Sequence, residues 1–497
     1  MGKLIIDRTS KRNKWTLMKY IKDFNLMVLY ADAVRNGKAD VSDKALKQIL
    51  EGMEMDDLYH PRFGKPSVHT IHFKICQVVY YMFAHKFKMK GNKVDKIIFS
   101  PLGNLLLDNK DDFKVVSRTF LCMLIGMPFK HPFNKMHKSF NLYPFRLIFK
   151  LLLDDRLGKE LYHDEVFYFV MFSKETDEIH YENLVFEILN FRKICPTEKY
   201  KLFKSNKEVE DVIANGLHEW NYTSGILEEA GIINWSKSDE NYGVLIHGNG
   251  SGRRRYKNDS ISLKQEISPF CEILINNYSF SEKPQDLIAS LQLNSEYVIQ
   301  LYNFYPVELI EELELKTSEQ DKIISILKIS DEINHYAKNK EHGDAYKFED
   351  VLTVGMNYFY DVLAEKHASA GTTDIECIYT SENYIDEKFD VEAKSTKNKL
   401  LQINNGRLRY HREIIGSNYT IVITPNFAPA VIEDIKNSNN VILRSSSFSN
   451  YLYQSISKNG REISYSPIHE IINTNMGKDI TPYVNQYVYE NFGIDAK

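Results

Sequence analysis

Two acidic residues and a lysine in the last third of the 497-residue chain have the types and spacing that phosphodiester hydrolysis needs. Asp374 stands at the start of a strand predicted over TTDIECIY, and Glu392 and Lys394 lie in a second predicted strand, FDVEAKS. Side chains alternate along a strand, so Glu392 and Lys394 are expected on one face, where Asp374 can join them. Asp374 and Glu392 would ligate Mg²⁺, and Lys394 would orient or deprotonate the attacking water or stabilise the pentavalent state.

The elements around these residues favour a nuclease fold. A helix predicted over AYKFEDVLTVGMNYFYDVLAEK precedes the strands and carries Glu349, which could hold a second metal ion or a metal-bound water. A polar helix, KNKLLQINNGRLRYHREIIG, follows them, and the apolar strand YTIVITP and the strand-helix pair NNVILRSSSFSNYLYQSI complete a mixed sheet. A D-x(n)-E-x-K string also arises by chance, but this element order is that of the PD-(D/E)xK nuclease core.

The polar helix that follows the second strand offers minor candidates for the same site. Gln402, Arg409 and His411 lie in or just before it and could reach the scissile phosphate or the DNA backbone. The alternative is a solvated helix face that contributes only general positive charge.

Composition indicates a large globular protein of two to four domains, with 43% hydrophobic and 26% charged residues. The 63 basic and 67 acidic residues are nearly balanced, so affinity for DNA would have to come from local patches. The five cysteines never occur as CxxC, which argues against a zinc site. Neither a signal peptide nor a membrane-spanning stretch is indicated, and we expect a cytoplasmic protein.

Two basic segments in the first half of the chain are candidate DNA contacts. The loop YHPRFGKPSVH carries Arg62 and Lys65, either as phosphate contacts or as a solvated turn. Residues 211–231 are predicted to form two helices, and the runs IINWSKS and YGVLIHG to form a hairpin, which is a winged-helix order. The hairpin continues into HGNGSGRRRYK, whose basic residues form either the best phosphate-binding cluster or a solvated loop: Arg253, Arg254, Arg255 and Lys257. No Walker motif accompanies the glycines.

The resulting domain prediction has three parts. Residues 1–260 would form a mainly helical, winged-helix-like DNA-recognition region, and 261–345, with helices such as PVELIEELELK, a helical linker. Residues 346–497 would form the α/β PD-(D/E)xK endonuclease domain.

Several segments resemble a known enzyme family. FEDVL, TTDIECIY and VEAKSTK resemble the catalytic domain of type IIS restriction endonucleases, particularly the AlwI family and its nicking relatives, and more distantly the FokI-like cleavage domain. FSPLGNLLLDN, GMPFKHPFNKM and YPFRLIFKLLLD look like the recognition region of AlwI-type enzymes. The resemblance implies an N-terminal region that reads a short asymmetric site in double-stranded DNA and a Mg²⁺-dependent nuclease that cuts outside it.

Within that resemblance, Asp374, Glu392 and Lys394 match the metal and water positions, and Glu349 matches the helix carboxylate. Two departures stand out: Thr373 replaces the usual proline before Asp374, and 392 − 374 = 18 positions separate the two strand carboxylates. Double-strand cleavage would need a transient homodimer or a partner subunit, whereas a protein with a weak dimer surface would nick.

Two alternatives stay open from the sequence. The chain could be another PD-(D/E)xK nuclease, acting on modified bases, in repair or in phage defence, although no base-flipping pocket is identified. It could also be a non-catalytic winged-helix DNA-binding protein, which would bind DNA without metal-dependent cleavage.

Overall fold

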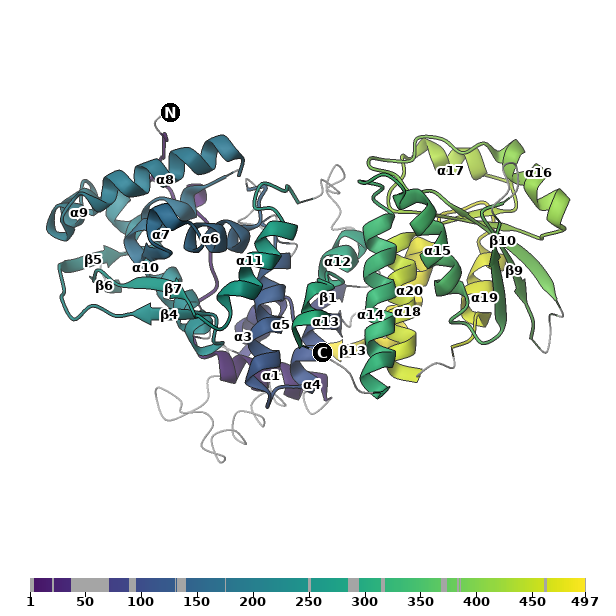
Figure 1. Cartoon of the computed structure of the whole chain (residues 1–497), viewed down its shortest axis with the longest axis horizontal. Helices are drawn as coiled ribbons and strands as arrows, with labels where there is room; N and C mark the ends of the chain where they lie inside the picture. Colours follow the sequence, from purple (N-terminus) through teal and green to yellow (C-terminus); the bar gives the residue numbers. More distant parts are fainter. Residues whose placement is uncertain are drawn as a thin grey trace. The chain divides into compact units, whose positions relative to one another are not determined.

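The computed structural model divides the chain into two compact units (Figure 1). Unit 1 comprises residues 1–85, 102–289 and 495–497, and unit 2 comprises residues 86–101 and 290–494. The structure describes residues 4–19, 22–36, 71–88, 95–129, 131, 140–174, 176–248, 252–284, 295–313, 318–367, 373–381, 384, 386–459 and 463–496.

Unit 1 is mainly helical. Its α-helices are α1 (Phe24–Arg35), α3 (Ile71–Tyr80), α4 (Pro101–Asp108, whose first residue falls in unit 2), α5 (Phe113–Gly126), α6 (Pro144–Leu152), α7 (His163–Tyr168), α8 (Glu178–Arg192), α9 (Pro196–Phe203), α10 (Lys207–Glu229) and α11 (Ser268–Asn277). Short 3-10 turns lie at Lys11–Asn13, Asp155–Leu157 and Val170–Phe172. Its strands are β3 (Glu160–Tyr162), β4 (Ile233–Ser236), β5 (Gly243–His247), β6 (Gly252–Tyr256) and β7 (Ser260–Leu263).

The prediction of two helices over residues 211–231 is wrong, because α10 runs unbroken for 23 residues. The helix begins at its N-cap Asn206, whose side chain accepts a hydrogen bond from the Val209 amide. Gly216, inside the helix, does not end it. A Cβ at Gly216 would lie 3.2 Å from the Cβ of Phe167, so the glycine allows α7 to pack closely against α10.

The predicted hairpin of IINWSKS with YGVLIHG is also wrong. β4 pairs antiparallel with β7, and β7 also pairs with β3, which makes a three-stranded sheet in the order β3-β7-β4. β5 pairs with β6 instead, so the β5–β6 hairpin is an insertion between β4 and β7. Local spacing predicts that a strand ends at residues 239–241, but the partner of each strand depends on contacts made after the chain folds.

Unit 2 contains a five-stranded mixed sheet with helices on both faces. Its helices are α12 (Ser295–Tyr302), α13 (Glu308–Leu313), α14 (Ser318–Tyr336), α15 (Asp344–Met356), α16 (Asn405–Ile415), α17 (Ala430–Ile435), α18 (Ser445–Asn459), α19 (Ser466–Thr474) and α20 (Thr481–Phe492). Its strands are β2 (Asp95–Phe99), β8 (Val362–Lys366), β9 (Ile375–Tyr379), β10 (Glu387–Ala393), β11 (Thr420–Thr424) and β12 (Asn440–Arg444). Two further strands, β1 (Ala84–Lys88) and β13 (Ile494–Ala496), cross the unit boundaries.

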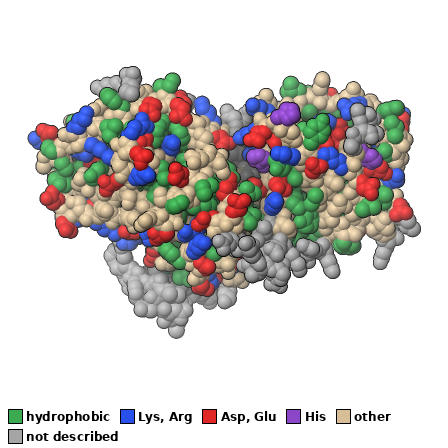
Figure 2. All heavy atoms as spheres, in the orientation of Figure 1, with side chains coloured by type: hydrophobic (Ala, Val, Ile, Leu, Met, Phe, Trp, Pro, Cys, Tyr) green, Lys and Arg blue, Asp and Glu red, His purple; other side chains and the backbone are tan. Residues whose placement is uncertain are grey.

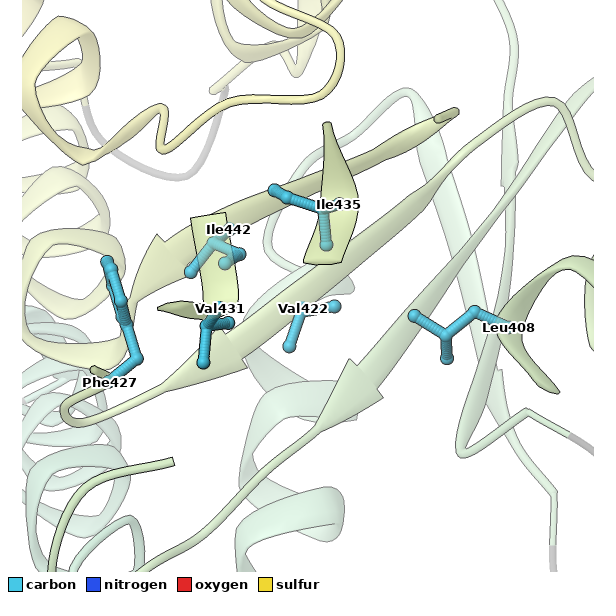
Figure 3. Packing of buried hydrophobic residues seen from close by; sticks show 6 residues of the cluster. All are labelled: Leu408, Val422, Phe427, Val431, Ile435 and Ile442. Atoms are coloured by element: carbon cyan, nitrogen blue, oxygen red, sulfur yellow. The ribbon is translucent and has the colours of Figure 1, made fainter. Parts of the chain in front are cut away.

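The strand order of the large sheet is β12-β11-β10-β9-β8. β8, β9 and β10 are antiparallel, whereas β10, β11 and β12 run parallel. α16 and α17 lie on one face, and α14, α15, α18 and α20 lie on the other (Figure 1). Beneath α16 and α17, an apolar cluster joins the helices to the parallel strands β11 and β12 (Figure 3); it consists of Leu408, Val422, Phe427, Val431, Ile435 and Ile442. This packing holds α16 next to the end of β10.

One predicted element of this unit changes type. The sequence predicts a single helix over residues 345–366, but α15 ends at Met356 and residues 362–366 form strand β8. Asn357 ends the helix because its side-chain amide donates to the Ala364 carbonyl at 2.9 Å and accepts from the Ala364 amide at 2.9 Å. These two bonds turn the chain back and start β8, one of the two edge strands of the sheet.

The segment predicted as a linker, 261–345, is shared between the two units. β7 and α11 belong to unit 1, and α12, α13 and α14 belong to unit 2, where α14 packs against α15 and α18.

No helix among the described residues has the length and apolar character needed to cross a membrane. On the face shown in Figure 2, basic and acidic side chains are intermixed.

Candidate active site

The structure brings Asp374, Glu392 and Lys394 together at the junction of β9 and β10. Ile375 pairs with Val391 across the two strands, so Asp374, one residue before β9, lies beside Glu392. Asp374 Oδ2 accepts a hydrogen bond from the Ala393 amide at 2.8 Å. The Lys394 ammonium group forms a short ion pair with Glu392 Oε1. The three residues predicted from the sequence to share one site therefore do so.

The electrostatics of this junction are unusual because two carboxylates are buried together. Glu392 is 1% exposed, and its second oxygen, Oε2, accepts no hydrogen bond from any described residue. Burial and the nearby charge of Glu392 raise the pKa of Asp374 to about 6, against the opposing effects of Lys394 and the Ala393 amide. Two carboxylates with one lysine leave excess negative charge, and a cation would relieve it.

Glu349 lies on α15, close enough for its charge to contribute to the raised pKa of Asp374. Its own carboxylate forms an ion pair with Lys366 of β8 at 3.1 Å, and the same ammonium contacts Asp350 at 2.7 Å. Within the described ranges, three or more His, Cys, Asp or Glu side chains nowhere converge as a metal-binding group. A role for Glu349 as a metal ligand stays a prediction.

A cavity of about 180 Å³ opens beside Glu392 and Lys394. Gln402, a minor candidate from the sequence, lines this cavity. Asn404 and Arg407 also line it and were not predicted. Asn404 is the N-cap of α16, and its side chain accepts a hydrogen bond from the Arg407 amide at 3.0 Å. A basic residue in the first turn of the helix after an E-x-K strand is the signal that could have identified Arg407.

His411, another of the minor candidates, lies one helical turn beyond Arg407 and is 2% exposed. The Arg407 Nε atom lies 3.5 Å from His411 Nε2, and burial lowers the pKa of His411. His411 is not among the residues that line the cavity. Arg409 points elsewhere on the helix and forms an exposed ion pair with Glu413 at 2.8 Å.

The predicted basic cluster near residue 255 is part of a strand. Arg253, Arg254 and Arg255 lie in β6, so their side chains alternate between the two faces of the β5–β6 hairpin. Arg253 and Arg255 are exposed. Arg254 is half-buried and donates to His218 Nδ1 of α10 at 3.1 Å and to the Arg253 carbonyl at 3.0 Å. Lys257 donates to the Ser238 carbonyl at 2.8 Å at the base of the hairpin.

Two helices of unit 1 anchor this hairpin. The Tyr200 hydroxyl of α9 donates to the Val244 carbonyl at 2.9 Å. On α10, Glu210 accepts from the Ile246 amide at 3.0 Å, and Asp211 accepts from the Gly248 amide at 2.6 Å. The hairpin therefore presents Arg253 and Arg255 from a fixed support. Arg62 and Lys65, the other predicted DNA contacts, lie outside the described residues.

One family model and one known enzyme match this chain, and the match to the enzyme spans nearly all of it. A family model described as the type II restriction endonuclease HgaI, N-terminal domain, matches residues 10–278. The chain is 38% identical over 488 residues to the type II restriction enzyme HgaI of Avibacterium volantium, a match that covers 96% of this chain and 98% of that enzyme.

Two solved structures of the restriction endonuclease FokI also align with the chain. The first covers 94% of this chain and 100% of FokI, at 9% identity and a TM-score of 0.29. The second, bound to DNA, covers 84% and 83%, at 9% identity and a TM-score of 0.25. TM-scores of this size do not establish a common fold.

The sequence match confirms the predicted class of enzyme, a type II restriction endonuclease, and both the relative and the family model are those of HgaI. The narrower resemblance to AlwI is not confirmed. From the extent of both matches, the chain belongs to the HgaI family of type II restriction endonucleases, which are site-specific deoxyribonucleases.

Proposed function

We propose that this restriction endonuclease is of the type IIS kind: unit 1 reads a short asymmetric site in double-stranded DNA, and the Asp374–Glu392–Lys394 centre hydrolyses phosphodiester bonds outside that site. The single observation that carries the assignment of the centre is the buried Glu392 carboxylate, with one oxygen unpartnered, beside Asp374 and Lys394. A buried carboxylate oxygen without a donor is costly unless a cation or proton completes it.

The residues present fit a Mg²⁺ ion. Mg²⁺ is commonly held by one or two carboxylates, with water and phosphate oxygens in the remaining positions. Asp374 and Glu392 would supply the carboxylates, the unpartnered Glu392 Oε2 among them. When bound, Mg²⁺ would polarise the phosphoryl oxygen and neutralise the charge that develops on it.

Two basic residues beside the carboxylates have complementary roles in the proposal. The Lys394 side chain is about one-third exposed, so its ammonium group can turn from Glu392 toward the substrate and hold the attacking water. Arg407 lines the cavity next to Glu392 and Lys394, and its planar guanidinium suits the non-bridging oxygens of the scissile phosphate. The helix N-terminus at Asn404 faces the same cavity, where its amide dipoles favour negative charge.

Part of unit 1 would form a winged-helix-like module. Support comes from the order α6, β3, α7, α10, β4 and β7, with the small sheet arranged as β3-β7-β4. The β5–β6 hairpin then occupies the position of the wing, and Arg253 and Arg255 would contact phosphates from it. Phosphate contacts of this kind position a protein on DNA, whereas the bases are read by other side chains.

Cutting both strands of DNA would require two nuclease centres or two successive cuts, because the described residues of one chain provide a single Asp374–Glu392–Lys394 set. A transient homodimer on DNA would supply the second centre. The order of the cleavage rate in enzyme concentration distinguishes a dimer from successive nicking.

The test combines plasmid cleavage with mapping of the ends. We expect the full chain with Mg²⁺ to yield fragments whose ends lie at constant offsets from one asymmetric sequence. EDTA, Asp374→Asn and Glu392→Gln should each abolish cleavage and leave DNA binding intact, because the substitutions preserve side-chain volume and remove only charge.

Glu365→Gln is the matched control, because Glu365 is an exposed carboxylate on β8 in the same sheet. This variant should cut like the unsubstituted enzyme. Wild-type cleavage by Asp374→Asn would refute the assigned centre, and ends inside a symmetric site would refute the type IIS assignment while leaving the centre intact.

A further inference from the structure

A third carboxylate, Asp390, is buried in the sheet two residues before Glu392. Asp390 is 0% exposed and lies on β10, opposite Glu376 of β9 and Thr420 of β11. By strand alternation, its side chain lies on the same face as Glu392. Asp390 does not line the cavity beside Glu392, so the proposed chemistry leaves this costly buried group unexplained.

Hydrogen bonds from two directions hold the Asp390 carboxylate. Its Oδ1 accepts from the Ser417 hydroxyl at 2.5 Å and from the Thr420 hydroxyl at 3.2 Å. Thr420 in turn accepts from Arg412 at 2.7 Å, so a buried guanidinium supports this side of the network. The network fixes Asp390 against β11, the central parallel strand.

The other oxygen of Asp390 reaches toward the active site. Oδ2 accepts from the Thr373 hydroxyl at 3.1 Å, and Thr373 is 1% exposed. Thr373 directly precedes Asp374, which itself lies before the first residue of β9. The regular pairing of β9 with β10 begins only at Ile375, so it does not by itself position the Asp374 side chain.

We infer that Asp390 is a positioning residue for this nuclease, which acts through the Thr373 hydroxyl to hold the Asp374 carboxylate beside Glu392. The Thr373 bond ties the residue before Asp374 to Asp390 of β10, and the Ala393 amide, three residues farther along β10, donates to Asp374 Oδ2. The inference rests on the proposed role of Asp374 in the nuclease centre. Groups that orient metal ligands typically change metal affinity or activity by about 10- to 100-fold when they are removed.

The test compares two substitutions of Thr373 in the full chain. Thr373→Val keeps the shape of the side chain and removes its hydroxyl donor, whereas Thr373→Ser keeps the donor. We expect the Thr373→Val variant to cut about 10- to 100-fold more slowly in a single turnover at saturating DNA. It should also bind Mn²⁺ more weakly, as measured without DNA from the free-ion electron paramagnetic resonance signal. The DNA dissociation constant should be unchanged, and the Thr373→Ser variant should stay within about threefold of the original rate, well inside that range.

Ser417→Ala controls for a purely structural effect, because it removes a different donor to Asp390 and leaves the Thr373 bond in place. Its melting temperature should fall about as much as that of the Thr373→Val variant, with a smaller loss of rate. The inference is overturned if Thr373→Val cuts and binds Mn²⁺ normally, or if the rates of all three variants simply follow their stabilities.

Asp374→Asn, measured in parallel, separates this inference from the proposed function. An inactive Asp374→Asn with a fully active Thr373→Val would overturn only the positioning role. A fully active Asp374→Asn would instead overturn the nuclease centre on which the inference depends.

Discussion

Replacing Arg253 and Arg255 together with glutamine tests whether the β5–β6 hairpin contacts the DNA backbone. Both arginines are exposed on β6, and they alternate with Arg254, which donates hydrogen bonds to His218 Nδ1 and to the Arg253 carbonyl. The double variant therefore removes two charges from one face of an anchored hairpin and leaves the bonds that hold it.

The expected effect follows from the release of counterions. The logarithm of the DNA association constant falls as the logarithm of the salt concentration rises, with a slope of about −0.9 for each phosphate neutralised on duplex DNA. Two lost contacts should therefore make this slope less steep by about 1.8. Between about 50 and 200 mM salt, the unsubstituted enzyme should therefore lose roughly tenfold more affinity than the double variant. The loss of affinity at low salt should be the same for specific and unrelated sequences.

Fluorescence anisotropy with labelled duplexes in EDTA measures these slopes without cleavage. Arg254→Gln is the matched control, because it removes one positive charge of the same kind from the hairpin's other face. This variant should keep the original slope and lose stability instead. An unchanged slope in the double variant, or an equal fall in the slope of Arg254→Gln, would refute the assignment of Arg253 and Arg255 to phosphates.

Three further predictions concern the cavity, a buried ion pair and the base of the hairpin. Arg407→Gln should slow single-turnover cleavage by about 100-fold with little change in DNA affinity, because a preorganised donor near the developing charge is lost. Lys14→Met should lower the free energy of unfolding, measured by urea titration, by about 3–5 kcal/mol, because Lys14 pairs with buried Glu219 at 2.7 Å. Gly243→Ala should destabilise it by about 1–3 kcal/mol, because the glycine has a φ of 155° and a Cβ would lie 2.2 Å from the Tyr200 ring.

Each of these predictions has a control in the same element or contact. Arg409→Gln, in the same helix but outside the cavity, should cut normally. Lys19→Met should lower the free energy of unfolding less than Lys14→Met does, because Lys19 is 30% exposed and lies 3.4 Å from Glu219. Gly248→Ala should lower the free energy of unfolding less than Gly243→Ala does. Gly248 has a φ of 67°, but no atom lies within 4 Å of an added Cβ. Equal losses within any pair would contradict the corresponding structural reason.

The sequence by itself determined the composition of the proposed nuclease centre and predicted the main elements that carry it. Strand periodicity was sufficient to place Glu392 and Lys394 on one face, and the apolar runs of β11 and β12 were sufficient to predict two further strands of a mixed sheet. These features depend on residues a few positions apart, where spacing alone specifies direction. The order of β9, β10, α16, β11, β12 and α18 could be predicted for the same reason, whereas α17, α19 and α20 were not predicted.

Only the tertiary structure decided which partners these elements have. β4 pairs with β7 rather than with β5, Glu349 pairs with Lys366, and Arg254 separates from Arg253 and Arg255 by bonding to α10. Such contacts join segments whose separation along the chain varies, so local patterns do not encode them. The Thr373 hydroxyl is the clearest case. The sequence shows only that a threonine stands where the resembled family usually has a proline, and the fold alone brings its hydroxyl to the buried Asp390. Burial makes that contact specific, because a carboxylate removed from water must find its donors within the protein.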